Sequence, residues 1–354
     1  MLTLAAGGWV LLTAGGLCVA VFIWWLAGAL PRLHAPRGDG IDVATYGFDL
    51  STCLVSRAHI SAGGRPRDTL PVLTDPPVLT PRELATLAEE LRRGHQGKFL
   101  VPSDLVVGVE LNGVARAYPL RLLRWHQIVN DTLGGVPITV TFTPLSDSLV
   151  VFERRVTETV VEFGDSGLVY GAAPLLYDRQ PAAEAESLWS PLQLRALTGP
   201  AAAEGMRLRP LPAALMPWRE WQVRHPQATV LAPQPALWRL YKESPDWERL
   251  AERLADTVRP APPADGPAPL AQMLIVPVGE TWHAWALAEL VANGAASGET
   301  QIRAADMSLR VRVSQHPATA WVESADPLLP VLYSRWFAWY AQHPQTRVEV
   351  LARD

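Results

Sequence analysis

The longest run of hydrophobic positions lies at the start of the chain. From Met1 to Leu30 no side chain is charged. The part from Trp9 onward is about 22 residues long, enough for a helix rising 1.5 Å per residue to cross a bilayer core of roughly 30 Å. Trp24 and Trp25 lie near its end, where membrane helices carry interfacial tryptophans. We therefore expect residues 1–30 to form a single transmembrane anchor that contacts the lipid bilayer through residues 9–30.

A cleaved signal peptide is the alternative for this segment, because Ala27-Gly28-Ala29 has the small residues of a cleavage site. No Lys or Arg precedes the apolar run, however, which favours retention of the segment. The side of the membrane stays open at this point. Arg32 and Arg37 follow the span and favour a cytoplasmic domain, but Asp39 and Asp42 follow at once and the bias is small.

After the anchor, the pattern changes to many short elements. Residues 31–79 are rich in Pro and Gly and predict an extended segment. The stretch TPRELATLAEELRRG predicts a helix, because Thr80 and Glu83 form a capping box and leucines recur with helical spacing. Two further helices are predicted, a short one over MPWREWQVRHP and a longer one over SPDWERLAERLADTVRP with Ser244 as its N-cap.

Alternating hydrophobic residues predict strands in the rest of the chain. LVVGVELNGVARAYPL predicts a β-hairpin with Asn112-Gly113 as its two-residue turn. A short helix over residues 120–129 follows. VPITVTFTPL and SLVVFER are rich in β-branched and aromatic residues, which favours strands. The expected fold class is therefore α+β and β-rich.

The hairpin–helix pattern recurs towards the C-terminus. MLIVPVGETWHAWALAEL (273–290) resembles LVVGVELNGVARAYPLRLL (105–123). The Pro-rich residues 260–269 separate the two and predict a linker. We expect a main domain over residues 80–259 and a smaller β-rich unit over residues 270–354, which is either a degenerate repeat without the His126 region or a chance similarity.

Composition is that of a globular protein with a sizeable core, since hydrophobic residues make up 49% and charged residues 19%. The formal net charge of −4 gives no reason to expect nucleic acid as a partner. We expect no disulfide, because Cys18 lies in the anchor and Cys53 beyond it. The tryptophans of WFAWYAQHP, Trp336 and Trp339, are candidates for a protein interface together with Trp24 and Trp25.

Candidate chemistry centres on His126, which follows a predicted helix. As a functional residue it would be a base or a ligand, but no Cys or second His lies near it, so a structural histidine is favoured. Asn130-Asp131 would either orient His126 or form a turn before Gly134-Gly135. The other histidines are scattered and no Gly-rich phosphate loop follows a strand, so we expect no metal and no cofactor.

A second group of polar residues follows in LLYDRQ and ESLWS. Asp178 and Arg179 would form a buried ion pair, and Ser187 would complete a Ser-His-Asp arrangement with His126. No G-x-S-x-G turn supports that arrangement, so a structural network is favoured over catalysis. Should the protein be an enzyme, its candidate catalytic residues are His126, Asp131, Asp178, Arg179 and Ser187.

Several long motifs are shared with one family. GVELNGVARAYPLRLLRWHQIVNDTLGGVPITVTFTPL resembles the bacterial and archaeal domain-of-unknown-function family 3179, and so do YGFDLSTCLVSRAHISAGGRPRDTLPVLTDP and FGDSGLVYGAAPLLYDRQ. The resemblance covers nearly everything after the anchor and implies no reaction. Its members look exported, which implies a bacterial inner-membrane protein with its domain on the periplasmic side.

Three positions depart from the pattern of that family. The family's Tyr-Cys-Pro-Leu-Cys is Phe-Thr-Pro-Leu-Ser here, so Thr143 and Ser146 replace both cysteines, and Gln127 replaces a Glu. The resemblance implies soft-metal binding or dithiol chemistry at Cys-x-x-Cys, neither of which hydroxyl groups can supply. We therefore predict a site that has kept its fold and lost its chemistry.

These observations lead to one functional hypothesis and one alternative. The hypothesis is a membrane-anchored, non-catalytic accessory subunit that binds the other subunits of a larger membrane complex; a respiratory or photosynthetic complex would suit it. The alternative is a membrane-tethered extracytoplasmic enzyme, or a protein that binds a small ligand or a metal, using the region around His126.

Overall fold

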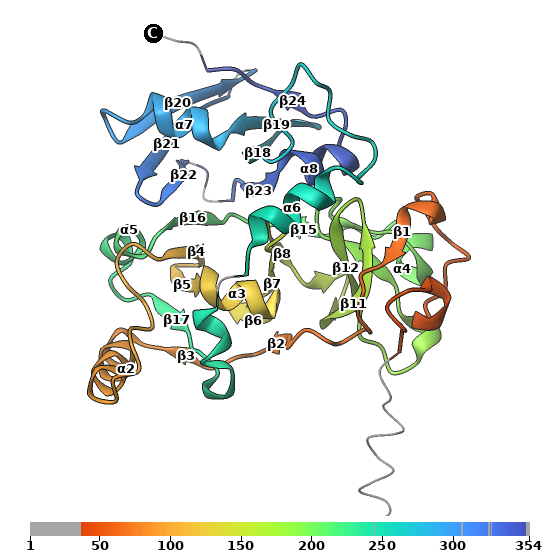
Figure 1. Ribbon diagram of the computed structural model, residues 1–354, viewed down its shortest axis with the longest axis horizontal. Helices are drawn as coiled ribbons and strands as arrows, with labels where there is room; N and C mark the ends of the chain where they lie inside the picture. The colour runs from red at the N-terminus through yellow and green to blue at the C-terminus, as the bar shows by residue number, and fades with distance from the viewer. Residues whose placement is uncertain (1–36, 244, 306, 325, 327, 352–354) are drawn as a thin grey trace, which may run out of the picture. The chain divides into compact units, whose positions relative to one another are not determined.

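The computed structural model describes residues 37–243, 245–305, 307–324, 326 and 328–351 (Figure 1). The chain from Gly38 onward forms one compact unit. The expected anchor, with Trp24 and Trp25, lies outside the described residues. Of the helices that the structure describes, none is both long enough and hydrophobic enough to cross a bilayer.

The fold is β-rich α+β, as expected, and its strands form three larger sheets and two small ones in the described part. The nine-stranded sheet contains β2 (Leu73–Thr74), β6 (Ile128–Leu133), β7 (Val136–Thr143), β8 (Ser148–Glu153), β23 (Leu332–Arg335), β18 (Gln272–Val278), β19 (Thr281–Ala286) and β24 (Arg347–Val348) in that order, with β15 (Arg209–Pro210) on β8. One five-stranded sheet contains, in order, β16 (Ala214–Pro217), β4 (Leu105–Leu111), β5 (Val114–Pro119), β17 (Thr229–Leu231) and β3 (Val78–Leu79).

The other five-stranded sheet lies beside β6–β8 in Figure 1, on the right of the view. It contains, in order, β1 (Ile60–Ala62), β11 (Phe163–Tyr170), β12 (Ala173–Asp178), β13 (Leu188–Ser190) and β14 (Arg195–Ala196). The small sheets are β20 (Glu299–Ala304), β21 (Met307–Gln315) and β22 (Ala318–Glu323), and the pair β9 (Arg155–Val156) and β10 (Thr159–Val160).

The helices are short and lie between the strands. The α-helices are α2 (Pro81–Arg93), α3 (Leu120–His126), α4 (Gly199–Ala203), α5 (Trp218–Arg224), α6 (Trp247–Ala255), α7 (Leu287–Asn293) and α8 (Trp336–Gln342). The 3-10 helices are η2 (Val43–Tyr46), η3 (Arg57–His59), η4 (Ala183–Ala185), η5 (Pro235–Leu237) and η6 (Leu240–Lys242).

Local signals in the sequence set several element boundaries. The capping box of α2 is present, since Glu83 N donates to Thr80 Oγ1 and Thr80 N donates to Glu83 Oε2. The prediction of Ser244 as the N-cap of α6 is wrong. The cap is Asp246, whose carboxylate accepts from Arg249 N at 3.1 Å.

The predicted hairpin is formed by β4 and β5. Asn112 and Gly113 both have positive φ, as the two-residue turn requires. The helix after it ends at His126, three residues before the expected end at residue 129, because Gln127 is left-handed with φ 58° and β6 begins at Ile128.

Two parts of the chain repeat the same order of elements. In the first, the hairpin β4–β5 leads to α3, the three strands β6–β8, and later β16, α5 and β17. In the second, β18–β19 leads to α7, the three strands β20–β22, and then β23, α8 and β24. The second part therefore contains strands equivalent to those that follow His126, and the expectation that it lacks this region is wrong.

The pairing registers of the two parts coincide. β17 lies parallel to β5 with Val230 opposite Ala117, and β24 lies parallel to β19 with Val348 opposite Ala284. Gln127 O accepts from Phe142 N at 2.9 Å, and in the second part Gly298 O accepts from Val313 N at 3.0 Å. Gln127 and Gly298 are both left-handed. The repetition thus extends to individual hydrogen bonds.

Each three-stranded segment packs against the opposite part. β8 pairs with β23 through Leu149 and Tyr333, and Thr319 Oγ1 on β22 donates to Leu215 O on β16 at 2.7 Å. The main hydrophobic core includes side chains from both parts. Because each three-stranded segment packs against the opposite part, residues 38–354 form one unit despite the Pro-rich residues 260–269 between α6 and β18.

Trp336 and Trp339 belong to the core. Their exposed fractions are 1% and 0%. Trp339 packs between Trp282 and His343, with ring centroids 5.4 Å and 4.2 Å away. The expectation that these two tryptophans serve a protein interface is therefore wrong. The helix that contains them, α8, packs inside the fold, where large aromatic rings bury much apolar surface.

Candidate functional site

The three positions that depart from the family pattern lie together. Gln127 O accepts from Phe142 N at 2.9 Å, which places Gln127 beside the end of β7. Thr143 is the last residue of β7 and pairs with Ser148 on β8. Ser146 lies in the turn between these two strands and is fully buried. A cysteine pair in these two places would therefore lie at one turn, next to residue 127.

Three serine hydroxyl groups lie close together at this turn. Ser148 Oγ donates to Ser146 Oγ at 2.8 Å and lies 2.9 Å from Ser334 Oγ on β23. Ser334 Oγ in turn donates to Arg335 O at 3.1 Å. All three serines are buried. Each of the three hydroxyls has a polar neighbour inside the protein, as buried polar groups require, and none of them can form a thiolate.

Arg335, the last residue of β23 in the second part of the repeat, contacts the turn between β7 and β8. Its guanidinium donates to Asp147 Oδ2 at 3.1 Å and to Glu248 Oε2 on α6 at 2.7 Å. Burial raises the pKa of Asp147, although the charge of Arg335 opposes this. Arg335 Nη1 has no hydrogen-bond partner among the described residues. Neither Arg335 nor Asp147 is among the residues predicted from the sequence; the place of Asp147 directly after Ser146 is the signal that points to it.

His126 is fully buried, and both of its ring nitrogens have partners. Nδ1 lies 2.5 Å from Pro71 O, and Nε2 lies 2.7 Å from Tyr241 OH. Burial lowers the pKa of His126, so the neutral ring is favoured. A carbonyl can only accept, so Nδ1 carries the proton and Nε2 accepts from the tyrosine. The ring therefore joins the segment before β2 to η6.

Asn130 and Asp131 lie within β6, so the interpretation of this pair as turn-forming is wrong. Asp131 accepts from Arg116 Nη1, and from Tyr118 OH at 2.7 Å. Burial raises the pKa of Tyr118 well above its usual value, and the charge of Asp131 adds to this. Asn130 Nδ2 donates to Phe163 O at 2.8 Å and links β6 to β11.

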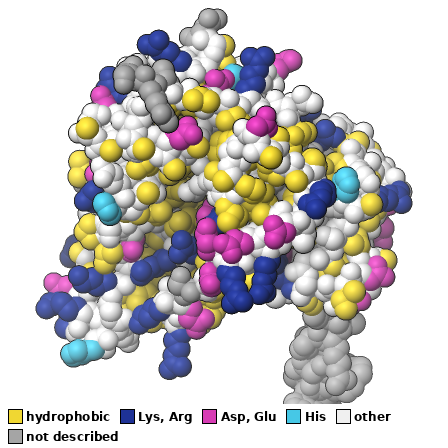
Figure 2. Space-filling view, turned by 45° about the horizontal axis from the view of Figure 1, so that its top comes forward, with side chains coloured by type: hydrophobic (Ala, Val, Ile, Leu, Met, Phe, Trp, Pro, Cys, Tyr) yellow, Lys and Arg dark blue, Asp and Glu magenta, His cyan; other side chains and the backbone are white. Residues whose placement is uncertain are grey.

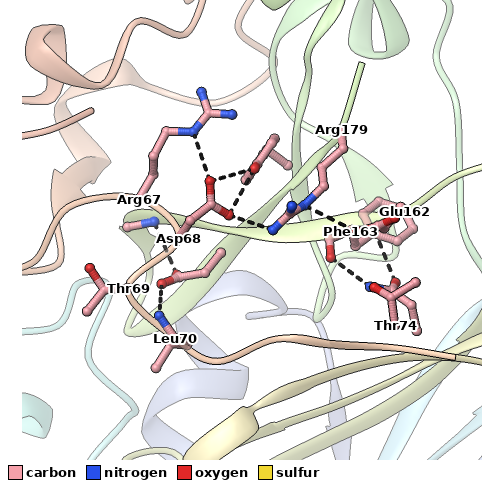
Figure 3. Close-up of polar contacts among 12 residues, drawn as sticks. Arg67, Asp68, Thr69, Leu70, Thr74, Glu162, Phe163 and Arg179 are labelled. Carbon is pink, nitrogen blue, oxygen red and sulfur yellow. Dashed lines mark hydrogen bonds and ion pairs between the residues drawn. The ribbon is translucent and has the colours of Figure 1, made fainter. Parts of the chain in front are cut away.

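A second polar network surrounds Asp68, between β12 and the segment before β2 (Figure 3). Tyr177 OH donates to Asp68 Oδ2 at 2.8 Å, and Arg179 Nη2 donates to Oδ1 at 2.8 Å. Arg179 also lies 3.5 Å from Glu162. Burial raises the pKa of Tyr177 to about 12. The ion pair expected between Asp178 and Arg179 is thus replaced by one between Arg179 and Asp68.

The buried cation of this network is Arg67. Its guanidinium lies 4.0 Å from the centre of the Tyr177 ring and donates to both carboxylate oxygens of Glu186, at 3.0 and 2.8 Å. Burial lowers the pKa of Arg67, but the hydrogen bonds to Glu186 and Tyr177 outweigh burial and raise it. Neither Arg67 nor Glu186 could be predicted from the sequence, since 119 residues separate them.

Asp178 and Ser187 do not form a catalytic triad with His126. Asp178 Oδ1 accepts from Ser187 N, and burial raises the pKa of Asp178 to about 6. Ser187 Oγ accepts from Ala201 N at 3.0 Å. Because both nitrogens of His126 bind other groups, His126 is not available as a base for the hydroxyl of Ser187. His126 instead joins the segment before β2 to η6, and Asp178 and Ser187 accept hydrogen bonds from backbone N–H groups.

The described residues contain no group of three or more His, Cys, Asp and Glu side chains placed to hold a metal ion. No curated protein and no solved structure matches the chain. Residues 67–346 match the model of one family, described as a protein of unknown function. This match covers the turn at Thr143–Ser146 and both parts of the repeat up to the residue before β24. The chain therefore belongs to the DUF3179 family.

Proposed function

We propose that the protein is a membrane-anchored, non-catalytic accessory subunit of a larger membrane complex. The observation that carries the proposal is the state of His126, whose two ring nitrogens are both occupied inside the core. A general base or a metal ligand needs a nitrogen that faces a substrate or an ion. His126 has none to offer without breaking a contact that holds the fold.

The turn at Thr143–Ser146 supports the same proposal. Two hydroxyl-bearing side chains stand at the positions of the family's cysteines, and Ser146 is enclosed in a chain of serine hydroxyls. Ser187 and Asp178 are likewise bound to backbone N–H groups. A turn with hydroxyl groups at the positions of the family's cysteines suits a role in assembly rather than in catalysis.

Membrane attachment rests on the uncharged residues 1–30 of the sequence. An anchor of this kind would hold the domain at the bilayer surface beside integral subunits. The family resemblance favours the periplasmic side of a bacterial inner membrane.

Purification of the tagged full-length protein from its own membranes in a mild detergent tests the proposal. We expect membrane subunits to co-purify in stoichiometric amounts, as identified by mass spectrometry. The control carries residues 1–37 fused to an unrelated domain, and it should capture none of them. A full-length protein that purifies as a lone monomer would refute the subunit role.

A further inference from the structure

A pocket of about 540 Å³ lies between the C-terminal half of α2 and the loop that follows it. Leu91 and Phe99 form its buried apolar lining, together with the half-buried Leu100. This volume lies within the range of small-molecule sites in proteins, about 300–1,000 Å³. In Figure 1, α2 stands at the edge of the domain. The pocket is therefore an apolar hollow at an exposed position.

The rim of this pocket is basic. Arg92, His95 and Lys98 line it, and all three side chains are exposed. No carboxylate lies within ion-pair distance of Arg92 or Lys98 in the described part of the chain. Glu89 is an acidic residue on the same lining. Figure 2 shows Lys and Arg side chains gathered at the lower left of the face it presents.

Two further cations hold the loop in place. Arg121 Nη1 donates to Phe99 O at 2.7 Å, and Lys242 Nζ donates to Gln96 O at 2.6 Å. Lys242 keeps its positive charge there, because a backbone carbonyl carries no net charge. Arg121 also lies 3.7 Å from the carboxylate of Asp104, which partly balances its charge. The loop is thus preorganised, and its positive charge contrasts with the net charge of −4 of the chain.

We propose that this pocket binds an acidic phospholipid, with the phosphate between Arg92 and Lys98 and the first part of an acyl chain against the half-buried Leu100, next to Leu91 and Phe99. The charge and the apolar lining together match an amphiphile with an anionic head. Basic residues near an anionic bilayer surface attract acidic lipids. The inference rests on the proposed membrane anchoring, which would hold the domain beside lipid.

Lipid titration of the purified full-length protein in dodecyl maltoside, read by native mass spectrometry, tests this. The probes are dioleoylphosphatidylglycerol and dioleoylphosphatidylcholine, which share their acyl chains. We expect about tenfold tighter binding of the anionic lipid. R92Q/K98Q should abolish this preference. The matched control R82Q/R249Q changes two exposed arginines away from the pocket and the same net charge, and it should retain the preference.

Equal binding of the two lipids, or equal loss of preference in both double variants, would overturn the proposal. Oleate and inorganic phosphate distinguish the source of the anion. Saturable binding of either one that requires Arg92 and Lys98, without preference for the anionic phospholipid, would also overturn it. The titration needs no partner subunit. A protein that selects the anionic lipid but purifies as a monomer would refute the subunit role and leave the lipid site standing.

Discussion

The indole N–H of Trp339 donates a hydrogen bond to Thr346 Oγ1 at 2.7 Å, whereas the indole N–H of Trp221 has no partner among the described residues. The two tryptophans hold equivalent places in the repeat. Each packs against the histidine four residues later, with ring centroids 4.1 Å apart for Trp221 and His225. The residue equivalent to Thr346 in the first part is Ala228, whose methyl group cannot accept a hydrogen bond.

This asymmetry predicts the effect of removing one hydroxyl. Thr346→Val keeps the volume of the side chain and leaves a buried indole N–H unpaired, so it should lower the free energy of unfolding by about 1–3 kcal/mol. Chemical denaturation of the solubilised full-length protein measures this. Thr159→Val, on the exposed strand β10, is the control and should change stability by less than about 0.5 kcal/mol. Equal effects of the two substitutions would contradict the prediction.

Structural features that depend on residues close together in the sequence could be predicted from it. The capping box at Thr80, the Asn112-Gly113 turn and the β-rich class rest on local spacing and are present. The contacts that define the site are not local. Arg335 reaches Asp147 across 188 residues, and no periodicity links them. Trp336 was misjudged for the same reason, since an aromatic-rich helix has the same composition whether it faces a partner or its own core.

His126→Ala should lower the melting temperature and leave the composition of any purified complex unchanged. The substitution leaves Pro71 O and Tyr241 OH without their partner and opens a cavity, so we expect a loss of about 2–5 kcal/mol. Differential scanning fluorimetry of the solubilised protein measures the shift. His59→Ala is the control, because His59 is exposed. A variant with unchanged stability that no longer binds a ligand or partner would show instead that His126 is functional.

The burial of His126 also predicts a dependence on pH. Its pKa is lowered in the folded state, so the unfolded chain binds the proton more readily as the pH falls below the unfolded value of about 6.5. Stability contributed by the neutral ring should therefore be complete above pH 6.5 and decline below it. The difference in unfolding free energy between wild type and His126→Gln, followed from pH 7.5 to 5, isolates this contribution. A difference that is constant with pH would contradict it.

Asp178 should show the opposite dependence. Burial raises its folded pKa from 3.8 to about 6, so the folded state binds the proton more tightly and stability falls as the pH rises between these two values. The shift corresponds to roughly 3 kcal/mol at most. Asp178→Asn keeps an oxygen for Ser187 N and does not titrate. The unfolding free energy of wild type minus that of the variant should therefore decrease from pH 4 to pH 6 and level off above.

The buried pair of Arg67 and Glu186 should be more sensitive to half removal than to complete replacement. Arg67→Met leaves the carboxylate buried without a partner and should lower the unfolding free energy by about 3–5 kcal/mol, whereas R67M/E186L should recover most of that loss. Recovery will be incomplete, because the guanidinium also stacks on Tyr177 at 4.0 Å. The exposed pair of Arg209 and Glu153 is the control, and Arg209→Met should lower stability by less than about 1 kcal/mol. A double variant no more stable than Arg67→Met would show that packing around the guanidinium, rather than the uncompensated charge, dominates at this position.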